Sequence, residues 1–220
     1  MSSIIVSVRD LMVKFGHVVA LEDISLDIER GRTLLIGPNG SGKSTLLNVI
    51  TGLIKPSSGK VKVLGYDPLR DNSKLNKKIL YIRDKDDFPR LMKISTYVGI
   101  LSSIYGKDRV IEALVQFELD KHIHKRFHEL SKGLQRRVIL LEALVSNKEL
   151  IIFDEPFSGL DTYSRDMICK ALDMIKGSII IASHIPPLMH FDQLILLEGG
   201  RVTYSGEYRH DISTSYFQVA

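Results

Sequence analysis

The chain has 220 residues, of which 44% are hydrophobic and 25% charged, and its formal net charge is +4. This length fits one domain with room for an inserted subdomain, and it excludes two independent catalytic domains. The composition excludes global disorder because it supplies enough apolar residues for a core. The small charge excess does not by itself indicate nucleic acid. The single cysteine, Cys169, excludes an intrachain disulfide and favours a reducing compartment, and no Cys/His spacing suggests structural zinc.

No apolar run approaches the roughly 20 residues that a membrane-spanning helix requires. The first residues also lack the basic and apolar regions of a secretory signal. We therefore expect a soluble chain that acts at a membrane only through a partner.

Several segments of the sequence predict β-strands. Residues 24–29 alternate apolar and polar side chains, which predicts a strand of an antiparallel sheet with one buried face. Short, nearly continuous apolar runs are typical of parallel strands covered on both faces, and they occur at 33–36, 150–153 and 178–182. A Gly-Gly pair at 199–200, between two further apolar runs, predicts a hairpin. The strands therefore predict a central parallel sheet with antiparallel additions.

Helical spacing interrupts the strand series from about residue 91 to residue 145. Few β-branched residues alternate there, so the segment does not continue the sheet. We expect an inserted helical subdomain at 91–145 within a single domain covering 1–220.

A glycine-rich segment directly after the apolar run 33–36 carries the strongest chemical signal. Glycines let backbone amides turn inward around phosphate oxygens, a lysine reaches the β/γ-phosphates, and a hydroxyl ligates magnesium. The segment also precedes a helical run, as this motif requires, and it consists of Gly37, Pro38, Asn39, Gly40, Ser41, Gly42, Lys43 and Ser44, followed by Thr45. A chance match in a chain of this length is about one in a hundred. The sequence therefore predicts a nucleoside triphosphate site in which Ser44 holds magnesium.

Two acids, Asp154 and Glu155, end the apolar run 150–153. A nucleotidase needs one carboxylate to hold magnesium and another to polarise water. Taken alone the pair equally fits solvated acids at the end of a strand. Beside a phosphate loop, it favours Asp154 as a metal ligand and Glu155 as the general base.

Three further segments complete a family pattern. They are Leu130-Ser131-Lys132-Gly133-Leu134, Ser158-Gly159-Leu160-Asp161 and Ser183-His184. With these motifs in this order, the chain resembles the ATP-binding cassette (ABC) ATPases, the nucleotide-binding subunits of ABC transporters, over nearly its whole length. The resemblance implies an α/β fold: a P-loop (RecA-like) nucleotide-binding core with an antiparallel β subdomain and an inserted helical subdomain.

The resemblance also implies residue roles. Phe15 falls where the family stacks an aromatic ring on adenine, and Ala20 falls at a small apolar contact nearby; a core aromatic is the alternative for Phe15. Ser131 and Gly133 would meet the γ-phosphate of ATP held by the other subunit, and a role as helix N-cap for Ser131 is compatible with this. His184 would contact the γ-phosphate and position the attacking water.

Four further residues stand at family positions, and three of them depart from the usual residue. Asp161 ends the segment that resembles the family's D-loop, and the resemblance implies that it belongs to the nucleotide-binding residues. Lys132 and Leu134 depart from the Gly and Gln of the family signature, and activity is expected to survive this change. Asp84 stands where the family usually has a glutamine that reaches magnesium and the membrane subunit. An acid there resembles the type-2 exporter group, although Glu would be usual, and Asp84 is expected to reach magnesium through a water; a loop-capping Asp is the alternative.

The basic run 121–137 has two interpretations. It suggests phosphate or lipid headgroup binding, but a solvated helix is favoured because the signature subdomain already accounts for it. His122, His124 and His128 lack the acidic or cysteine partners of a metal set.

We therefore expect ATP and Mg²⁺ to bind, and ATP to be hydrolysed in a head-to-tail dimer with a second ABC ATPase subunit, identical or homologous. The expected partner is an integral membrane permease, with no nucleic acid, and the expected place is cytoplasmic, at the inner face of the cell membrane. One alternative is a soluble ABC ATPase acting on the ribosome, DNA or cluster assembly. Another is a cassette that binds ATP without hydrolysis, against which Glu155 and His184 argue.

Overall fold

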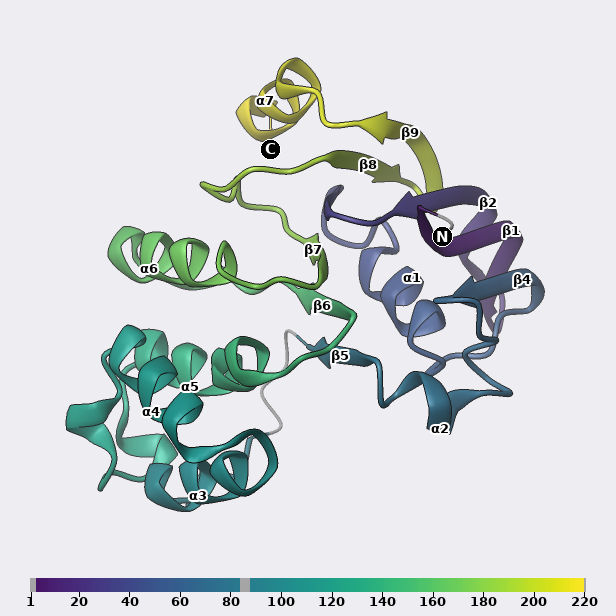
Figure 1. Ribbon diagram of the computed structural model, residues 1–220. Helices are drawn as coiled ribbons and strands as arrows, with labels where there is room; N and C mark the ends of the chain where they lie inside the picture. Colours follow the sequence, from purple (N-terminus) through teal and green to yellow (C-terminus); the bar gives the residue numbers. More distant parts are fainter. Residues whose placement is uncertain (1–2, 84–87, 220) are drawn as a thin grey trace.

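Two β-sheets organise the protein, whose computed structural model describes residues 3–83 and 88–219, without the side chains of 218 and 219 (Figure 1). The first sheet has the strand order β2-β1-β4. Its strands are β1 (Ile4–Phe15), β2 (Val18–Glu29) and β4 (Ser58–Val63). Ile24, Leu26 and Ile28 on β2 are buried, whereas Ser25 and Glu29 are exposed. The predicted antiparallel strand with one buried face is therefore confirmed.

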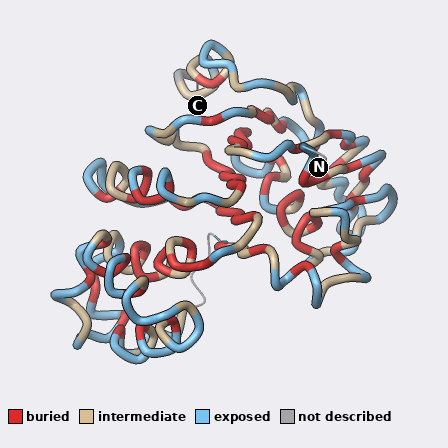
Figure 2. Tube along the Cα trace, in the orientation of Figure 1, coloured by how far each residue is buried: buried red, intermediate tan, exposed pale blue. Residues whose placement is uncertain are grey.

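The second sheet has six strands in the order β5-β6-β7-β3-β8-β9. They are β3 (Arg32–Ile36), β5 (Ile79–Ile82), β6 (Leu150–Asp154), β7 (Ser178–Ala182), β8 (Gln193–Glu198) and β9 (Arg201–Glu207). Neighbouring strands are parallel except for β8 and β9. Every residue of β6 and β7 is buried, because α5 and α6 pack against one face and α1 with the antiparallel sheet against the other (Figure 2). The predicted parallel core is therefore confirmed.

A hairpin joins β8 to the antiparallel edge strand β9. Gly199 and Gly200 between them have φ angles of 53° and 78°. Two consecutive left-handed residues make the tight turn whose twist matches that of paired strands, and glycine adopts this conformation without strain. The predicted hairpin is confirmed.

The helices lie mainly after β3, between β5 and β6, and after β6. They are α1 (Lys43–Ile50), α2 (Asn72–Leu75), α3 (Ile94–Tyr105), α4 (Lys107–Gln116), α5 (Lys132–Val145), α6 (Thr162–Leu172) and α7 (His210–Val219), with 3₁₀ turns at Asp120–His122 and Phe127–Glu129. Figure 1 shows α3, α4 and α5 gathered in a lobe beside the sheet, in teal. None of the described helices combines the length and apolar character needed to cross a bilayer.

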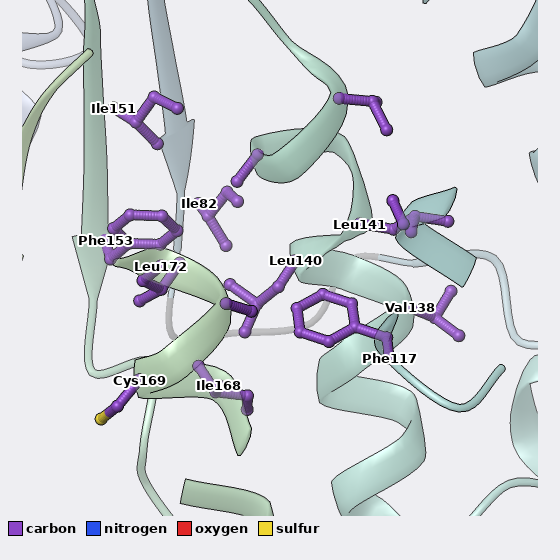
Figure 3. Close-up of a cluster of buried hydrophobic side chains, with 14 of the residues drawn as sticks. Ile82, Phe117, Val138, Leu140, Leu141, Ile151, Phe153, Ile168, Cys169 and Leu172 are labelled. Carbon is purple, nitrogen blue, oxygen red and sulfur yellow. The ribbon is translucent and has the colours of Figure 1, made fainter. Parts of the chain in front are cut away.

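Helix α5 joins this lobe to the core. Its residues Val138, Leu141 and Val145 share one face, and all three are fully buried. Figure 3 shows Leu140 in the middle of the cluster, with Phe117 of the lobe nearby and Phe153 of β6 beyond it. The lobe and the sheet therefore share one continuous apolar core.

The basic run 121–137 is not one solvated helix, so that interpretation is wrong. The chain forms two 3₁₀ turns before α5 begins at Lys132. Arg136 and Arg137 are each only 5% exposed. Their guanidinium groups bind partners inside the protein, as described below.

Candidate active site

The phosphate loop lies between β3 and α1, where the sheet meets the antiparallel subdomain. Gly42 has a φ of 104°. A Cβ on Gly42 would come within 2.8 Å of the Ala20 carbonyl oxygen and 2.7 Å of Leu21 Cδ2. Only glycine fits this left-handed, crowded position, so the close approach places Ala20 of β2 directly beside the loop.

Lys43 begins α1 with its ammonium group folded back into the loop. Its side chain is 6% exposed, and Nζ donates hydrogen bonds to the carbonyl oxygens of Gly37 at 2.7 Å and Pro38 at 3.3 Å. Ser41 Oγ is buried and has no hydrogen-bond partner among the described residues. Among the residues that the structure describes, no side chain caps the first amides of α1. A buried ammonium, an unpartnered hydroxyl and uncapped amides fit the oxygens of a phosphate chain.

The two acids at the end of β6 differ in their surroundings. Asp154 is 3% exposed, and its Oδ2 accepts a hydrogen bond from the Tyr81 hydroxyl at 3.4 Å. Glu155 has a φ of 50°, a left-handed conformation that costs a non-glycine residue about 1–2 kcal/mol. Its backbone N–H donates to the Ala182 carbonyl at 2.9 Å, which holds this turn against β7. This strained turn follows Asp154, the last residue of β6, directly.

The Glu155 carboxylate contacts two of the predicted catalytic residues. Oε1 lies 3.6 Å from Lys43 Nζ, and Oε2 lies 2.7 Å from His184 Nδ1. The His184 backbone N–H also donates to Oε2 at 3.2 Å. The structure thus brings Lys43, Glu155 and His184 from three separate segments into one cluster. Their roles in catalysis stay predictions.

The sequence did not reveal the function of Arg136. Its guanidinium donates to the backbone carbonyls of Asp154 at 3.3 Å, Glu155 at 2.9 Å and Pro156 at 3.0 Å, and to that of Arg83 at 3.3 Å. These bonds tie α5 to the turn that carries both acids. The charged side chain was assigned to a solvated face, and nothing in the local sequence distinguishes it from one.

The signature segment lies at the start of α5. Ser131 is its N-cap, and Ser131 Oγ accepts a hydrogen bond from the Leu134 N–H at 3.4 Å. Asp161 similarly caps α6, accepting from the Ser164 N–H at 2.8 Å and the Ser164 hydroxyl at 3.0 Å. Both hydrogen bonds stabilise the charged carboxylate and lower the pKa of Asp161, and the bond from the Ser164 backbone N–H has the larger effect. Within residues 3–83 and 88–219, no hydrogen bond or ion pair joins Ser131 or Asp161 to the Lys43 cluster.

Arg137 connects these two capped helices to α4. Its Nη1 lies 3.1 Å from Glu118 Oε2, its Nη2 donates to Ser164 Oγ at 3.5 Å, and its guanidinium lies 5.6 Å from the centre of the Tyr163 ring. The Tyr163 hydroxyl donates to Glu118 Oε1 at 2.8 Å. One buried cation therefore holds α4, α5 and α6 together.

Gly133 is the close contact between the signature segment and α6, and replacing it tests this packing. A Cβ there would lie 2.6 Å from Ser164 Oγ, whose hydroxyl is already bound to Asp161. We expect Gly133→Ala to lower the free energy of unfolding by about 1–2 kcal/mol and to reduce ATP hydrolysis. Urea unfolding and a steady-state ATPase assay measure both effects.

The matched control is Gly99→Ala. Gly99 lies inside α3, and a Cβ there would meet nothing within 4 Å. This substitution should raise stability by about 0.5–1 kcal/mol, because alanine loses less backbone freedom than glycine in a helix. Equal stability and activity of the two variants would refute the packing argument.

The remaining predicted residues are placed as follows. Phe15 ends β1 with half of its surface exposed and belongs to neither buried cluster. Ser44 is exposed in the first turn of α1. Asp84 lies outside the described residues. No group of three His, Cys, Asp or Glu side chains suited to a metal occurs in the described part of the chain. Magnesium needs only one or two protein ligands when phosphates supply the others, so Ser44 and Asp154 remain its predicted ligands.

A glycine-rich loop between a buried parallel strand and a helix, with two acids at the end of a neighbouring strand, defines a P-loop nucleoside triphosphatase. The comparisons with known proteins narrow this class. The ABC transporter family model matches residues 21–158. The chain is 37% identical over 193 residues to the zinc import ATP-binding protein ZnuC of Vibrio vulnificus (strain YJ016), covering 83% of this chain and 68% of ZnuC. The chain belongs to the ABC transporter ATP-binding family.

Two solved structures carry the same fold. The CbiO1 protein of Clostridium perfringens, part of the CbiONQ ABC transporter complex, superposes with a TM-score of 0.81 at 26% identity, covering 98% of this chain and 93% of CbiO1. MJ0796, a bacterial ABC transporter cassette solved as a dimer, gives a TM-score of 0.78 at 25% identity, covering 93% of this chain and 99% of MJ0796. The predicted fold, a P-loop core with an antiparallel sheet and helices, is confirmed.

Proposed function

We propose that the chain is the ATP-binding and ATP-hydrolysing subunit of a transporter, and that it powers a separately encoded membrane permease through ATP-dependent dimerisation. The observation that carries this proposal is the cluster of Lys43, Glu155 and His184 at the mouth of the phosphate loop. Water can attack a γ-phosphate when a cation, a base and a polar ring lie together beside it. This cluster supplies all three groups.

The roles follow from the geometry of the cluster. Lys43 and the amides of loop 37–45 bind the phosphates, with Ser41 Oγ as a further donor. Glu155 accepts a proton from the attacking water, and His184, whose ring contacts the Glu155 carboxylate, orients that water. Ser44 and Asp154 hold magnesium, which neutralises charge on the phosphate oxygens when bound. Phe15 and Ala20 contact the adenine.

A second subunit completes each site in this proposal. Ser131 and Asp161 begin the neighbouring helices α5 and α6, and Gly133 lies against Ser164 of α6. Within the described ranges, no hydrogen bond or ion pair joins Ser131 or Asp161 to Lys43, Glu155 or His184. We assign Ser131, Gly133 and Asp161 to the ATP of a second cassette, identical or homologous, in a head-to-tail dimer. The existence of a dimeric relative supports this assignment. ATP then joins the two cassettes, and its hydrolysis lets them separate.

The permease is assigned to a groove beside the helical subdomain, which we place at 91–145. The groove has a volume of about 470 Å³, and its lining residues flank segment 84–87 on both sides. They include Tyr81, Arg83, Phe88, Pro89 and Met92. A mostly apolar groove, lined by residues that come before and after Asp84 in the sequence, suits a segment of a membrane subunit, which holds the chain at the cytoplasmic face of the membrane.

Purification of the complex from native membranes tests the proposal. We expect a polytopic membrane protein in stoichiometric amount, together with ATPase activity that requires magnesium. Co-purification with ribosomes or DNA in its place would support the alternative of a soluble ABC ATPase.

Asp84 gives a finer prediction about magnesium. An anion in place of the usual glutamine favours the magnesium-bound state, while the short side chain reaches the ion through a water. We expect Asp84→Ala to weaken magnesium dependence and hydrolysis moderately, and Asp84→Gln to restore much of the coupling to the permease. ATPase rates measured against magnesium concentration decide this. Curves identical to wild type for both variants would leave Asp84 as a loop-capping residue.

A further inference from the structure

Two segments of the helical lobe pair with each other although they lie about 30 residues apart in the sequence. The N–H groups of Ile94 and Ser95 donate to the carbonyls of Lys125 and Ile123, each at 2.9 Å. The Phe127 N–H donates to Met92 O at 3.0 Å, and Lys93 and Arg126 form an antiparallel bridge. We call residues 90–95 and 122–128 together the basic ribbon.

The pairing gathers positive charge that the sequence shows only in part. Arg90 and Lys93 come from the first segment, and Lys125 and Arg126 from the second; all four are exposed. In the described part of the chain, none of the four forms an ion pair. The nearest acid in sequence among the described residues, Glu129, accepts a hydrogen bond from the Arg126 backbone N–H. Asp84, Asp86 and Asp87 lie outside the described residues.

The bridge places Lys93 directly opposite Arg126. Like charges at directly opposed positions of an antiparallel pair are destabilising. Arg126 Nη1 donates to the Leu91 carbonyl at 3.1 Å, which holds this guanidinium at the ribbon. Among the described residues no carboxylate forms an ion pair with the side chain of Lys93 or Arg126, because the Glu129 carboxylate is bound to the Arg126 backbone N–H. The unpaired positive charge points to an anion supplied from outside.

A large apolar side chain lies among these cations. Leu91 is 68% exposed, between Arg90 and Met92 in sequence. Cations around an exposed leucine form the composition that binds an anionic lipid surface, where the cations meet phosphate headgroups and the apolar side chain enters the interface. A soluble polyanion would leave Leu91 in water.

The position of the ribbon indicates the same partner. Met92 belongs to the ribbon and also lines the groove that we assign to the permease, and Pro89 of that groove precedes the ribbon directly. The ribbon therefore borders the side of the cassette that faces the membrane, if the proposed function holds. We propose that the basic ribbon binds anionic phospholipid headgroups at the membrane surface around the permease.

Vesicle binding by the full chain tests the proposal without the permease. The probes are vesicles of phosphatidylcholine with about one-third phosphatidylglycerol and vesicles of phosphatidylcholine alone, compared by sedimentation at low and high salt. We expect binding to the anionic vesicles only, and loss of binding as salt rises, because salt screens surface charge.

The decisive variant combines Arg90→Gln, Lys93→Gln and Lys125→Gln. Each cation near an anionic surface contributes about fivefold, so the partition coefficient should fall about 100-fold. The matched control combines Lys55→Gln, Lys60→Gln and Lys62→Gln, which removes the same charge from exposed positions in or near the antiparallel sheet. Leu91→Ser should weaken binding about fivefold with no change of charge.

Equal binding of the ribbon and control variants, equal binding of neutral and anionic vesicles, or no binding at all would each overturn the proposal. If vesicles do not bind but the ribbon variant no longer co-purifies with the permease, the ribbon recognises an acidic segment of that protein. The basal ATPase rate of the ribbon variant should equal that of wild type. A wild-type chain without ATPase activity would contradict the proposed function, whatever the result with vesicles.

Discussion

Replacing Glu155 with glutamine is expected to slow ATP turnover by at least about 100-fold and to leave ATP affinity unchanged. A general base contributes roughly 100- to 10,000-fold to a rate, and glutamine keeps the size and hydrogen-bonding reach of the side chain while losing its basicity. The Glu155 carboxylate accepts from His184 on one oxygen and lies 3.6 Å from Lys43 on the other. The amide oxygen of glutamine retains one of these contacts, so binding should survive.

Because hydrolysis is then slow, dimers of Glu155→Gln should accumulate with ATP and magnesium. Size-exclusion chromatography with nucleotide detects them, and single-turnover assays give the rate. Glu112→Gln is the control, because Glu112 is exposed on α4 and forms no ion pair among the described residues. An unchanged hydrolysis rate in Glu155→Gln would refute its role as the base.

Lys43→Ala is expected to weaken ATP binding itself, by about 10- to 100-fold. Hydrogen bonds to a charged group contribute about 1.5–3 kcal/mol each, and this ammonium is the buried cation of the phosphate loop. Its present acceptors, the carbonyls of Gly37 and Pro38, belong to the loop itself. Losing these two hydrogen bonds should cost little stability, because water can bind the freed carbonyl oxygens in their place.

Isothermal titration with ATP and magnesium measures the affinity, and thermal unfolding without nucleotide reports the stability. Lys60→Ala serves as the control, because Lys60 is an exposed cation of β4. Wild-type affinity in Lys43→Ala would exclude Lys43 from phosphate binding.

Much of the central architecture could be predicted from the sequence because each signal was local. The apolar runs of β3, β6 and β7 and the glycine pair of the hairpin need only a few consecutive residues to be recognised. The acids at the end of β6 and the histidine after β7 meet because parallel strands end at the same edge of the sheet. Their proximity could therefore be expected before the structure was known.

The buried arginines and the basic ribbon could not be predicted in the same way. A charged side chain is usually exposed. Arg136 can be buried because its guanidinium donates hydrogen bonds to backbone carbonyls at the end of β6 and just after it. The ribbon forms because residues 90–95 and 122–128 exchange backbone hydrogen bonds across the lobe. Neither arrangement leaves a periodic signal, since both depend on tertiary contacts.

Arg136 and Arg137 are neighbours on α5, and successive side chains on a helix project about 100° apart. One is bound to the turn carrying Asp154 and Glu155, and the other to Glu118 and Ser164. A helix fixed on two sides in this way is restrained from rolling about its own axis. When α5 moves, α6 must then move with it, so Ser131 at the start of α5 and Asp161 at the start of α6 shift together as one rigid unit. The separation between these two groups within one subunit should therefore stay constant through the cycle of dimer formation and separation that we propose.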